Sequence, residues 1–407
     1  MVNIPALEGG TPVRTTPLAP HFIGANLIGS EEKKFVNEAI ENQSLFRHYG
    51  KCEPHFAADF EDEFAAYIGK KYALATATGS GAYFCMMKAL GIGADDEVII
   101  PAFGWVTDYN MVEMLGAVPV LAEIDESMNL SPEGFKACIT EKTKAVVVIH
   151  YQGGASRLDE IVEIARANDI IVIEDVAQAC GGSFKGKKLG AWGDVACYSL
   201  QNNKVITAGE GGVMVTDDQK IYELAVRYHD LGFIRPQFEK RLEKPVITEP
   251  VCGLQWRMNE MTGAVALAQL HQLDGIVANC KEKSALFRDA IKKEFPELKF
   301  RSVDPTNDIG IAVIFDLGSS ENVAKFNKYY EAEGLISRAT SGCQSFSMLE
   351  PTAFALKKRN YWPEALTNAE LIDSRTAKIA VLPVYTNDDI EDLALGAIKS
   401  LKAVLNK

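Results

Sequence analysis

Two short apolar runs and a glycine-rich turn in the middle of the chain restrict its fold more than any other feature. The first run, Ile170–Ile173, is followed by an acidic pair that ends with Asp175, and the second, Val195–Tyr198, leads into a polar segment that ends with Lys204. The turn Gly209–Gly212 comes next. Short apolar runs closed by glycines and polar residues are typical of buried strands in a parallel sheet. Ligands of such sheets bind beyond the carboxyl ends of the strands, which is where Asp175 and Lys204 are expected.

An aspartate and a lysine at one edge of a sheet fit a pyridoxal phosphate site. A lysine can form a Schiff base with this cofactor, and an aspartate can keep its pyridine nitrogen protonated. Each residue also has an ordinary interpretation, because Asp175 could cap a helix and Lys204 could be a solvated surface charge. Their combination with the glycine-rich turn favours the cofactor site.

Segments earlier in the chain supply further candidates for the same site. An expected strand, Tyr72–Ala77, runs through the small-residue turn Thr78–Gly81 into a helical stretch, a layout that holds phosphates but also begins ordinary helices. Trp105 follows an apolar strand and could stack on a cofactor ring or lie in the core. Arg47, among aromatic residues, could bind an anionic or hydroxylated substrate or pack on its neighbours.

Strand and helix patterns alternate along the first part of the chain. Strands are expected at Val118–Ile124 and Ala145–Ile149, and helices at Pro132–Ile139 and Leu158–Ala167. Strands separated by helices indicate a parallel α/β sheet. A long helical stretch is expected to open at Gly253 and to join this large domain to a smaller one.

The last part of the chain has a different pattern. Strands are expected at Gly310–Phe315 and Ala380–Val384, with helices at Ser320–Ala332 and Asp388–Leu405, which suggests a compact α+β domain. A length of 407 residues also favours two domains. The expected division is an N-terminal arm with the large domain at 1–257, an interdomain helix at 258–293 and a small C-terminal domain at 294–407.

Composition excludes several classes of function. The net charge of −13 argues against a nucleic-acid partner, which would require a basic face. No apolar run approaches the length of a membrane span and no signal region is visible at the N-terminus, so a cytoplasmic location is expected. Six histidines show no metal-ligand spacing. Reduced thiols are expected for the eight scattered cysteines, at positions 52, 85, 138, 180, 197, 252, 280 and 343.

With these segments in place, the sequence resembles the DegT/DnrJ/StrS aminotransferases from about Gly24 to Lys402. The most specific parts are Glu174–Ala179, Ser199–Lys204 and Thr207–Gly212. The resemblance implies a pyridoxal phosphate enzyme of fold type I, like aspartate aminotransferase. Such an enzyme has a large domain with a mostly parallel seven-stranded sheet and a smaller C-terminal α+β domain. It also implies a substrate that is a keto-sugar or a cyclitol, in the synthesis of amino sugars, antibiotics or polysaccharides.

The resemblance also implies roles for individual residues. Lys204 would hold the cofactor as a Schiff base, Asp175 would pair with the pyridine nitrogen, and Gln178 would lie beside the ring hydroxyl. Trp105 would stack on the ring. Further cofactor contacts are expected at Thr78, Gly79, Ser80, Ser199 and Asn202, and at Gln255 from the partner subunit of a homodimer.

Two departures from the family pattern bear on the substrate. Gln255 replaces the usual asparagine of the segment that reaches the neighbouring subunit's phosphate, and Gln201-Asn202-Asn203 replaces a commoner histidine-containing run. The glutamine form resembles members that act on cyclitols and some keto-sugars. Substrate contacts are expected at Arg47, Tyr49 and His229.

The implied reaction is a ping-pong transfer. Glutamate or glutamine would give its amino group and leave pyridoxamine phosphate, and a keto- or aldehyde sugar or a cyclitol would then take it. Sugar dehydratases of the family carry histidine at the lysine position, so Lys204 argues against a dehydratase. Decarboxylation or racemisation on the same fold is a second competing function, and a non-catalytic regulator that binds pyridoxal phosphate is a third. The complete set Asp175, Gln178 and Lys204 disfavours the regulator.

Overall fold

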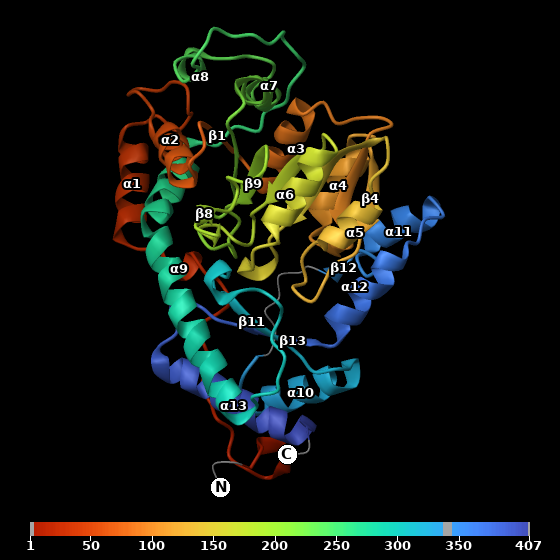
Figure 1. The fold of residues 1–407 in the computed structure, drawn as a ribbon. Coiled ribbons are helices and arrows are strands. Elements are labelled where there is room, and N and C mark those ends of the chain that lie inside the picture. Colours follow the sequence, from red (N-terminus) through yellow and green to blue (C-terminus); the bar gives the residue numbers. More distant parts are fainter. Residues whose placement is uncertain (1–3, 337–343, 406–407) are drawn as a thin grey trace.

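A seven-stranded sheet forms the centre of the protein in a computed structural model that describes residues 4–336 and 344–405 (Figure 1). Neighbouring strands follow the order β1-β10-β9-β6-β5-β2-β4. All strands run parallel except β10, which pairs antiparallel with β1 and β9, so the predicted mostly parallel sheet is confirmed. The strand bounds are β1 Tyr72–Thr76, β2 Glu97–Pro101, β4 Val118–Ala122, β5 Thr143–Ile149, β6 Ile171–Asp175, β9 Val195–Ser199 and β10 Gly212–Thr216.

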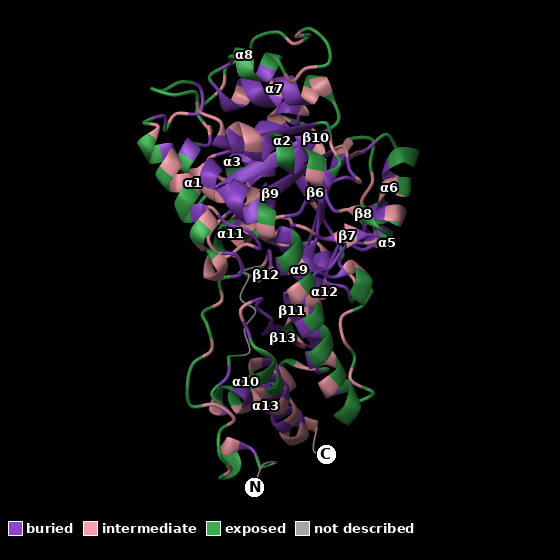
Figure 2. Cartoon of the chain, turned by 90° about the vertical axis from the view of Figure 1, so that its left-hand side faces the viewer, coloured by how far each residue is buried: buried purple, intermediate pink, exposed green. Residues whose placement is uncertain are grey.

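Helices cover both faces of this sheet, which explains why its strands are continuous apolar runs. In β1, Tyr72 and Leu74 join the core cluster beneath α3, α4 and α7, whereas Ala73 and Ala75 join the cluster beneath α2, α6 and the long helix α9 (Glu260–Glu294). Buried residues concentrate along the sheet and exposed ones at the periphery (Figure 2). The helix bounds are α1 Ser30–Glu41, α2 Phe56–Ile68, α3 Gly79–Ala89, α4 Val106–Met114, α5 Pro132–Ala137, α6 Leu158–Ala167, α7 Gln219–His229 and α8 Pro236–Glu239.

A long helix, α9, connects the large sheet to a smaller α+β layer (Figure 1). In that layer β11 pairs antiparallel with β13, and α10 and α13 pack beside each other. The bounds are α9 Glu260–Glu294, β11 Ala312–Asp316, α10 Ser320–Ala332, β13 Thr376–Ala380 and α13 Asn387–Leu405.

Two expected elements have different limits in the structure. The helix expected from Gly253 begins only at Glu260, because Asn259 caps it by accepting the Thr262 N–H at 2.9 Å. The strand expected at Ala380–Val384 ends at Ala380 instead. Pro383 lies in the segment that follows, and proline lacks the N–H that a continued ladder requires.

Two segments cross the expected domain division. The arm contacts the small layer, where Arg14 forms ion pairs with Asp389 at 2.8 Å and Asp392 at 2.7 Å. Helices α11 (Glu350–Lys358) and α12 (Glu364–Ser374) pack instead on α4 and β4 of the large domain. We therefore propose that the chain divides into domains at 257 and 293, although the arm and helices α11 and α12 pack across this division.

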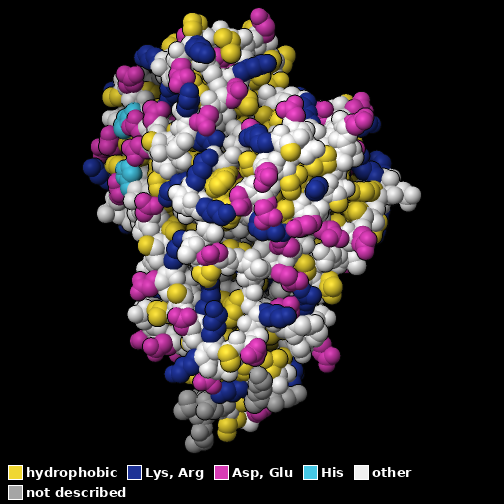
Figure 3. Space-filling model, in the orientation of Figure 1, with side chains coloured by type: hydrophobic (Ala, Val, Ile, Leu, Met, Phe, Trp, Pro, Cys, Tyr) yellow, Lys and Arg dark blue, Asp and Glu magenta, His cyan; other side chains and the backbone are white. Residues whose placement is uncertain are grey.

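Charged side chains of both signs are interspersed over the face shown in Figure 3. Within the described residues, no helix is both long and apolar enough to cross a membrane, and no group of three histidine, cysteine or acidic residues is placed to hold a metal ion. The seven cysteines of the described ranges are unpaired, and Cys343 lies outside those ranges.

Candidate active site

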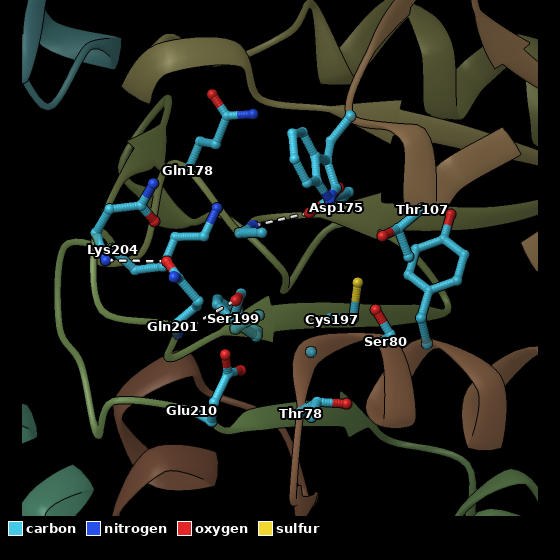
Figure 4. Close-up of a pocket in the computed structure, with 16 residues that line it drawn as sticks. Thr78, Ser80, Thr107, Asp175, Gln178, Cys197, Ser199, Gln201, Lys204 and Glu210 are labelled. Atoms are coloured by element: carbon cyan, nitrogen blue, oxygen red, sulfur yellow. Dashed lines mark hydrogen bonds between the residues drawn. The ribbon is translucent and has the colours of Figure 1, made fainter. Parts of the chain in front are cut away.

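A cavity of about 260 Å³ lies at the edge of the sheet where β1, β6 and β9 end and β10 begins. The parallel strands deliver their following residues to this edge, and the antiparallel strand β10 delivers its preceding turn to it. Figure 4 shows Lys204 and Gln178 on one side of the space, Thr107 and Ser80 on the other, and Asp175 between them. The lining residues are Thr78, Gly79, Ser80, Tyr83, Trp105, Thr107, Asp175, Ala177, Gln178, Cys197, Tyr198, Ser199, Gln201, Asn203, Lys204 and Glu210.

The start of α3 forms one wall of the cavity. Thr78 caps this helix, and its Oγ1 accepts the Gly81 N–H at 2.9 Å. The backbone N–H groups of Gly79 and Ser80, in the first turn, have no acceptor within the helix. Because free N–H groups and the helix dipole both favour negative charge, this wall can bind a phosphate.

Close packing at this wall explains why two of its positions are occupied by glycine. A Cβ on Gly212 would lie 2.5 Å from the Cα of Gly79 and 2.6 Å from the Thr78 carbonyl oxygen, so no larger residue fits there. A Cβ on Gly79 would lie 3.0 Å from the Cβ of Ser199. The turn is therefore pressed against the ends of β9 and β10, which fixes the direction of its N–H groups.

Strand alternation separates the two acids at the end of β6. Asp175 faces the cavity, is 9% exposed, and accepts the Ala177 N–H at 2.8 Å with its Oδ1. Glu174 points to the other face of the sheet, where its carboxylate accepts backbone N–H groups of Gly190, Trp192 and Gly193 and contacts His150. Only Asp175 is thus available to a ligand in the cavity.

Lys204 lies in the loop between β9 and β10. Its N–H donates to the Gln201 carbonyl oxygen at 2.9 Å and its own carbonyl oxygen accepts the Gly24 N–H at 3.0 Å. Thr207 strengthens the loop by donating its hydroxyl to the Leu200 carbonyl oxygen at 3.0 Å. These bonds hold the backbone of Lys204 at the cavity wall, while its side chain reaches into the space.

Most predicted cofactor residues line this one cavity, and two do not. Asn202 is absent from the lining, where its neighbour Asn203 appears instead. Gln255 is exposed and lies outside the cavity of its own chain, in an extended segment that pairs with Asp230. Its predicted contact with the partner's cofactor stays a prediction.

The three predicted substrate residues also lie outside the cavity. Arg47 is buried in an ion pair with Glu61 at 2.7 Å, and Tyr49 is 68% exposed. His229 is fully buried; its burial and then the nearby Arg47 lower its pKa to about 3. Within this chain Arg47 and His229 therefore belong to the buried interior of the large domain.

Several lining residues were not singled out from the sequence, among them Tyr83, Thr107, Cys197 and Glu210. Tyr83 lies one turn after the helix start, Thr107 lies two residues after Trp105, and Glu210 belongs to the glycine-rich turn. Cys197 pairs with Asp175 across β6 and β9. Period-two alternation from Ser199 could have placed Cys197 on the cavity face, because both residues share one face of β9.

The donor set fits pyridoxal phosphate. The N–H groups at the α3 start suit the phosphate, and Lys204 offers an amine in the same cavity. Asp175 offers a carboxylate. Its negative charge contributes to raising the pKa values of three buried acidic neighbours, Tyr83, Asp108 and Cys197. A buried carboxylate suits a protonated ring nitrogen, because the opposite charge offsets the cost of burying each group.

Comparisons with known proteins identify the family of the chain. Residues 26–395 match the model of the DegT/DnrJ/EryC1/StrS aminotransferase family. The chain is 31% identical to a GDP-perosamine synthase of Escherichia coli over 64% of this chain and 68% of that protein. It is 38% identical to a GDP-perosamine synthase of Caulobacter vibrioides over 62% of this chain and 65% of that one.

A solved structure supports the fold. The Helicobacter pylori aminotransferase PseC, involved in pseudoaminic acid biosynthesis, superposes with a TM-score of 0.80 at 18% identity, covering 94% of this chain and 99% of that one. The fold type predicted from the sequence is therefore confirmed. Because the family model spans nearly the whole chain, the protein belongs to the DegT/DnrJ/EryC1/StrS aminotransferase family and is a pyridoxal phosphate-dependent enzyme of that family.

Proposed function

We propose that this aminotransferase moves an amino group from glutamate or glutamine to a keto- or aldehyde sugar or a cyclitol, in two half-reactions at one site. The observation that carries the proposal is the meeting of Lys204, Asp175 and the anion-binding start of α3 in a single cavity. The similarity to GDP-perosamine synthases favours a nucleotide-linked sugar as the acceptor. Donor and acceptor would use the cavity in turn, because it contains one lysine.

Some residues of the chain would bind the cofactor, and Lys204 would transfer protons. When bound, pyridoxal phosphate supplies an aldehyde that bonds to amines and a ring that withdraws electrons. The N–H groups of Gly79 and Ser80 would hold the phosphate, and Asp175 would hold a proton on the ring nitrogen. Lys204 Nζ would take a proton from the donor carbon that bears the amino group, and would later return one to the acceptor carbon.

A half-reaction without acceptor tests this function. We expect glutamate or glutamine to bleach the visible absorbance of the purified holoenzyme and to release one equivalent of the matching 2-oxoacid per site. A regulator would keep its absorbance with both donors, and a dehydratase would release ammonia in a full turnover with sugar. Either result would refute the proposed transfer. Lys204 already disfavours the dehydratase, because those family members carry histidine at this position.

We also propose a homodimer in which each site is completed by its partner. The segment around Gln255 is fixed by hydrogen bonds between Leu231 N–H and the Leu254 carbonyl oxygen, at 3.1 Å, and between Leu254 N–H and the Tyr228 carbonyl oxygen, at 2.9 Å. Beside Gln255, Leu231 is 42%, Leu254 53% and Phe233 58% exposed. Apolar side chains exposed together favour a surface that another subunit covers, and a two-fold axis would then serve both sites.

Subunit mixing tests the shared site. Lys204→Ala and Gln255→Ala proteins should each be inactive as homodimers, and mixed dimers should regain activity. One mixed site would carry both defects and the other neither, so random mixing should restore about a quarter of the normal activity. Activity after dissociation and reassociation measures this recovery. A fully active monomer in sedimentation, or no recovery when Gln255→Ala alone is inactive, would contradict the shared site.

A further inference from the structure

A second carboxyl group lies buried near Asp175, close enough for the two to interact. Asp108, in the first turn of α4, is 1% exposed and does not line the cavity. Tyr83 of α3 and Cys197 of β9 are 2% and 4% exposed. They interact with both carboxyl groups and complete a cluster that we call the acidic cluster: Asp108, Asp175, Tyr83 and Cys197. Four separate elements thus bring together four groups that become negative when they lose a proton.

Asp108 has no hydrogen-bond partner of normal geometry. Both of its carboxyl oxygens are buried without one, and so is the Tyr83 hydroxyl. A Cβ on Gly104 would lie 3.7 Å from Oδ2 of Asp108, so this glycine borders the carboxyl group. Buried polar groups are nearly always satisfied, and a buried unpaired carboxylate is costly. An ionised Asp108 would therefore be unstable in this place.

The surroundings of Asp108 favour its neutral form. Burial raises the pKa of Asp108 well above its usual range, and the charge of Asp175 and a weak hydrogen-bond contact with it raise the pKa further. A contact with Tyr83 and the backbone at the start of α4 oppose this shift but are smaller. Burial also raises the pKa values of Tyr83 and Cys197. No group that faces Asp108 in this cluster supplies a positive charge.

We propose that Asp108 is a positioning residue: it keeps its proton, accepts a hydrogen bond from the Tyr83 hydroxyl and donates its own O–H to the carboxylate of Asp175. Small side-chain rotations would bring these neighbouring groups into normal geometry. Asp175 would then be held from two directions, by the Ala177 N–H at 2.8 Å and by Asp108. A hydrogen bond donated to a carboxylate favours its ionised form, so Asp108 would keep Asp175 charged and aimed at the cavity.

The protonation of Asp108 can be tested without cofactor or substrate. Infrared spectra of the apoprotein at neutral pH, with isotope-labelled aspartate, should show the carbonyl band of a protonated carboxyl group. Asp108→Asn should remove this band, and Asp175→Asn should leave it. Tyr109→Phe is the matched control, because Tyr109 is the next residue of α4 and its hydroxyl instead contacts Glu113 at 2.9 Å. A spectrum without the band, or a band that persists in Asp108→Asn, would overturn the proposal.

Two substitutions at Asp108 separate positioning from packing in the holoenzyme, where the inference rests on the proposed function. Asp108→Asn retains a donor of the same shape and should keep kcat within about twofold. Asp108→Ala removes the donor and should lower kcat about tenfold with little change in KM. The cofactor absorbance should change when the pH is lowered far enough to protonate Asp175. In Asp108→Ala this change should occur about one pH unit higher, because Asp175 has lost a hydrogen-bond donor that favours its ionised form.

The outcomes distinguish three explanations. If both Asp108 variants lose thermal stability while absorbance and kcat match those of Tyr109→Phe, the role is structural and the positioning proposal fails. If Asp108→Asn is as impaired as Asp108→Ala, the charged form is needed and the proposal also fails. If the unchanged protein shows the infrared band but no amino transfer, only the proposed function is refuted.

Discussion

Lys204→Ala is expected to abolish amino transfer, with a loss in turnover of roughly 10⁴-fold or more. The substitution removes the amine that bonds to the cofactor and the group that moves protons at the reacting carbons. The long-wavelength absorbance that the lysine-bound cofactor gives should disappear from the purified protein. Steady-state kinetics and an absorbance spectrum measure the two effects independently. The cavity wall should remain intact, because the loop is held by backbone and Thr207 hydrogen bonds.

Other lysines near this region provide the controls. Lys188 Nζ donates to the Tyr67 hydroxyl at 2.6 Å, and Lys187 lies 5.1 Å from the ring centre of Trp192. Neither lines the cavity. Lys188→Ala should therefore leave the visible absorbance and turnover nearly unchanged. Full turnover in Lys204→Ala would contradict the assignment and would make Lys187 and Lys188 the next candidates.

Asp175→Asn should keep the fold but lower turnover by about 10²- to 10⁴-fold. The amide oxygen of asparagine can still accept the Ala177 N–H, which Asp175 now accepts at 2.8 Å. A neutral side chain cannot hold the ring nitrogen protonated, so the electron-withdrawing power of the cofactor should fall. Circular dichroism should report an unchanged fold, and kcat should report the loss.

Asp218→Asn is the matched control for this variant. Asp218 likewise uses Oδ1 to accept a backbone N–H, from Ile221 at 2.9 Å, but it caps α7 away from the cavity. An asparagine is as good a cap as an aspartate, so activity should be retained. If Asp175→Asn and Asp218→Asn behave alike, Asp175 is only a structural cap and its expected role in the cavity is wrong.

Local patterns were sufficient for much of the fold. The apolar runs at Ile170–Ile173 and Val195–Tyr198 lie largely within β6 and β9, and the helix expected at Leu158–Ala167 has these limits in the structure. Such elements can be read from a few neighbouring residues, because periodicity and capping act over short distances. The motifs before Lys204 and around Asp175 indicated the family for the same reason.

The limits of other elements depended on distant contacts. The segment before α9 has a helical pattern, yet Gln255 and Trp256 are extended, because they pair with Asp230 and His229 at the end of α7. Arg47 was ambiguous in the sequence, and the structure places it against Glu61, which is 14 positions away. Local propensity is weak compared with such tertiary contacts.

The sequence by itself determined the α/β class, the family and the two residues on which the proposed chemistry depends, Lys204 and Asp175. Only the tertiary structure decided which neighbours share their cavity. In the structure Glu174 points to the opposite face of the sheet, Thr107 and Cys197 line the cavity, and Asp108 lies near Asp175. These relations join strands and helices far apart in the chain, and the direction of a side chain there depends on register and packing, which no short segment contains.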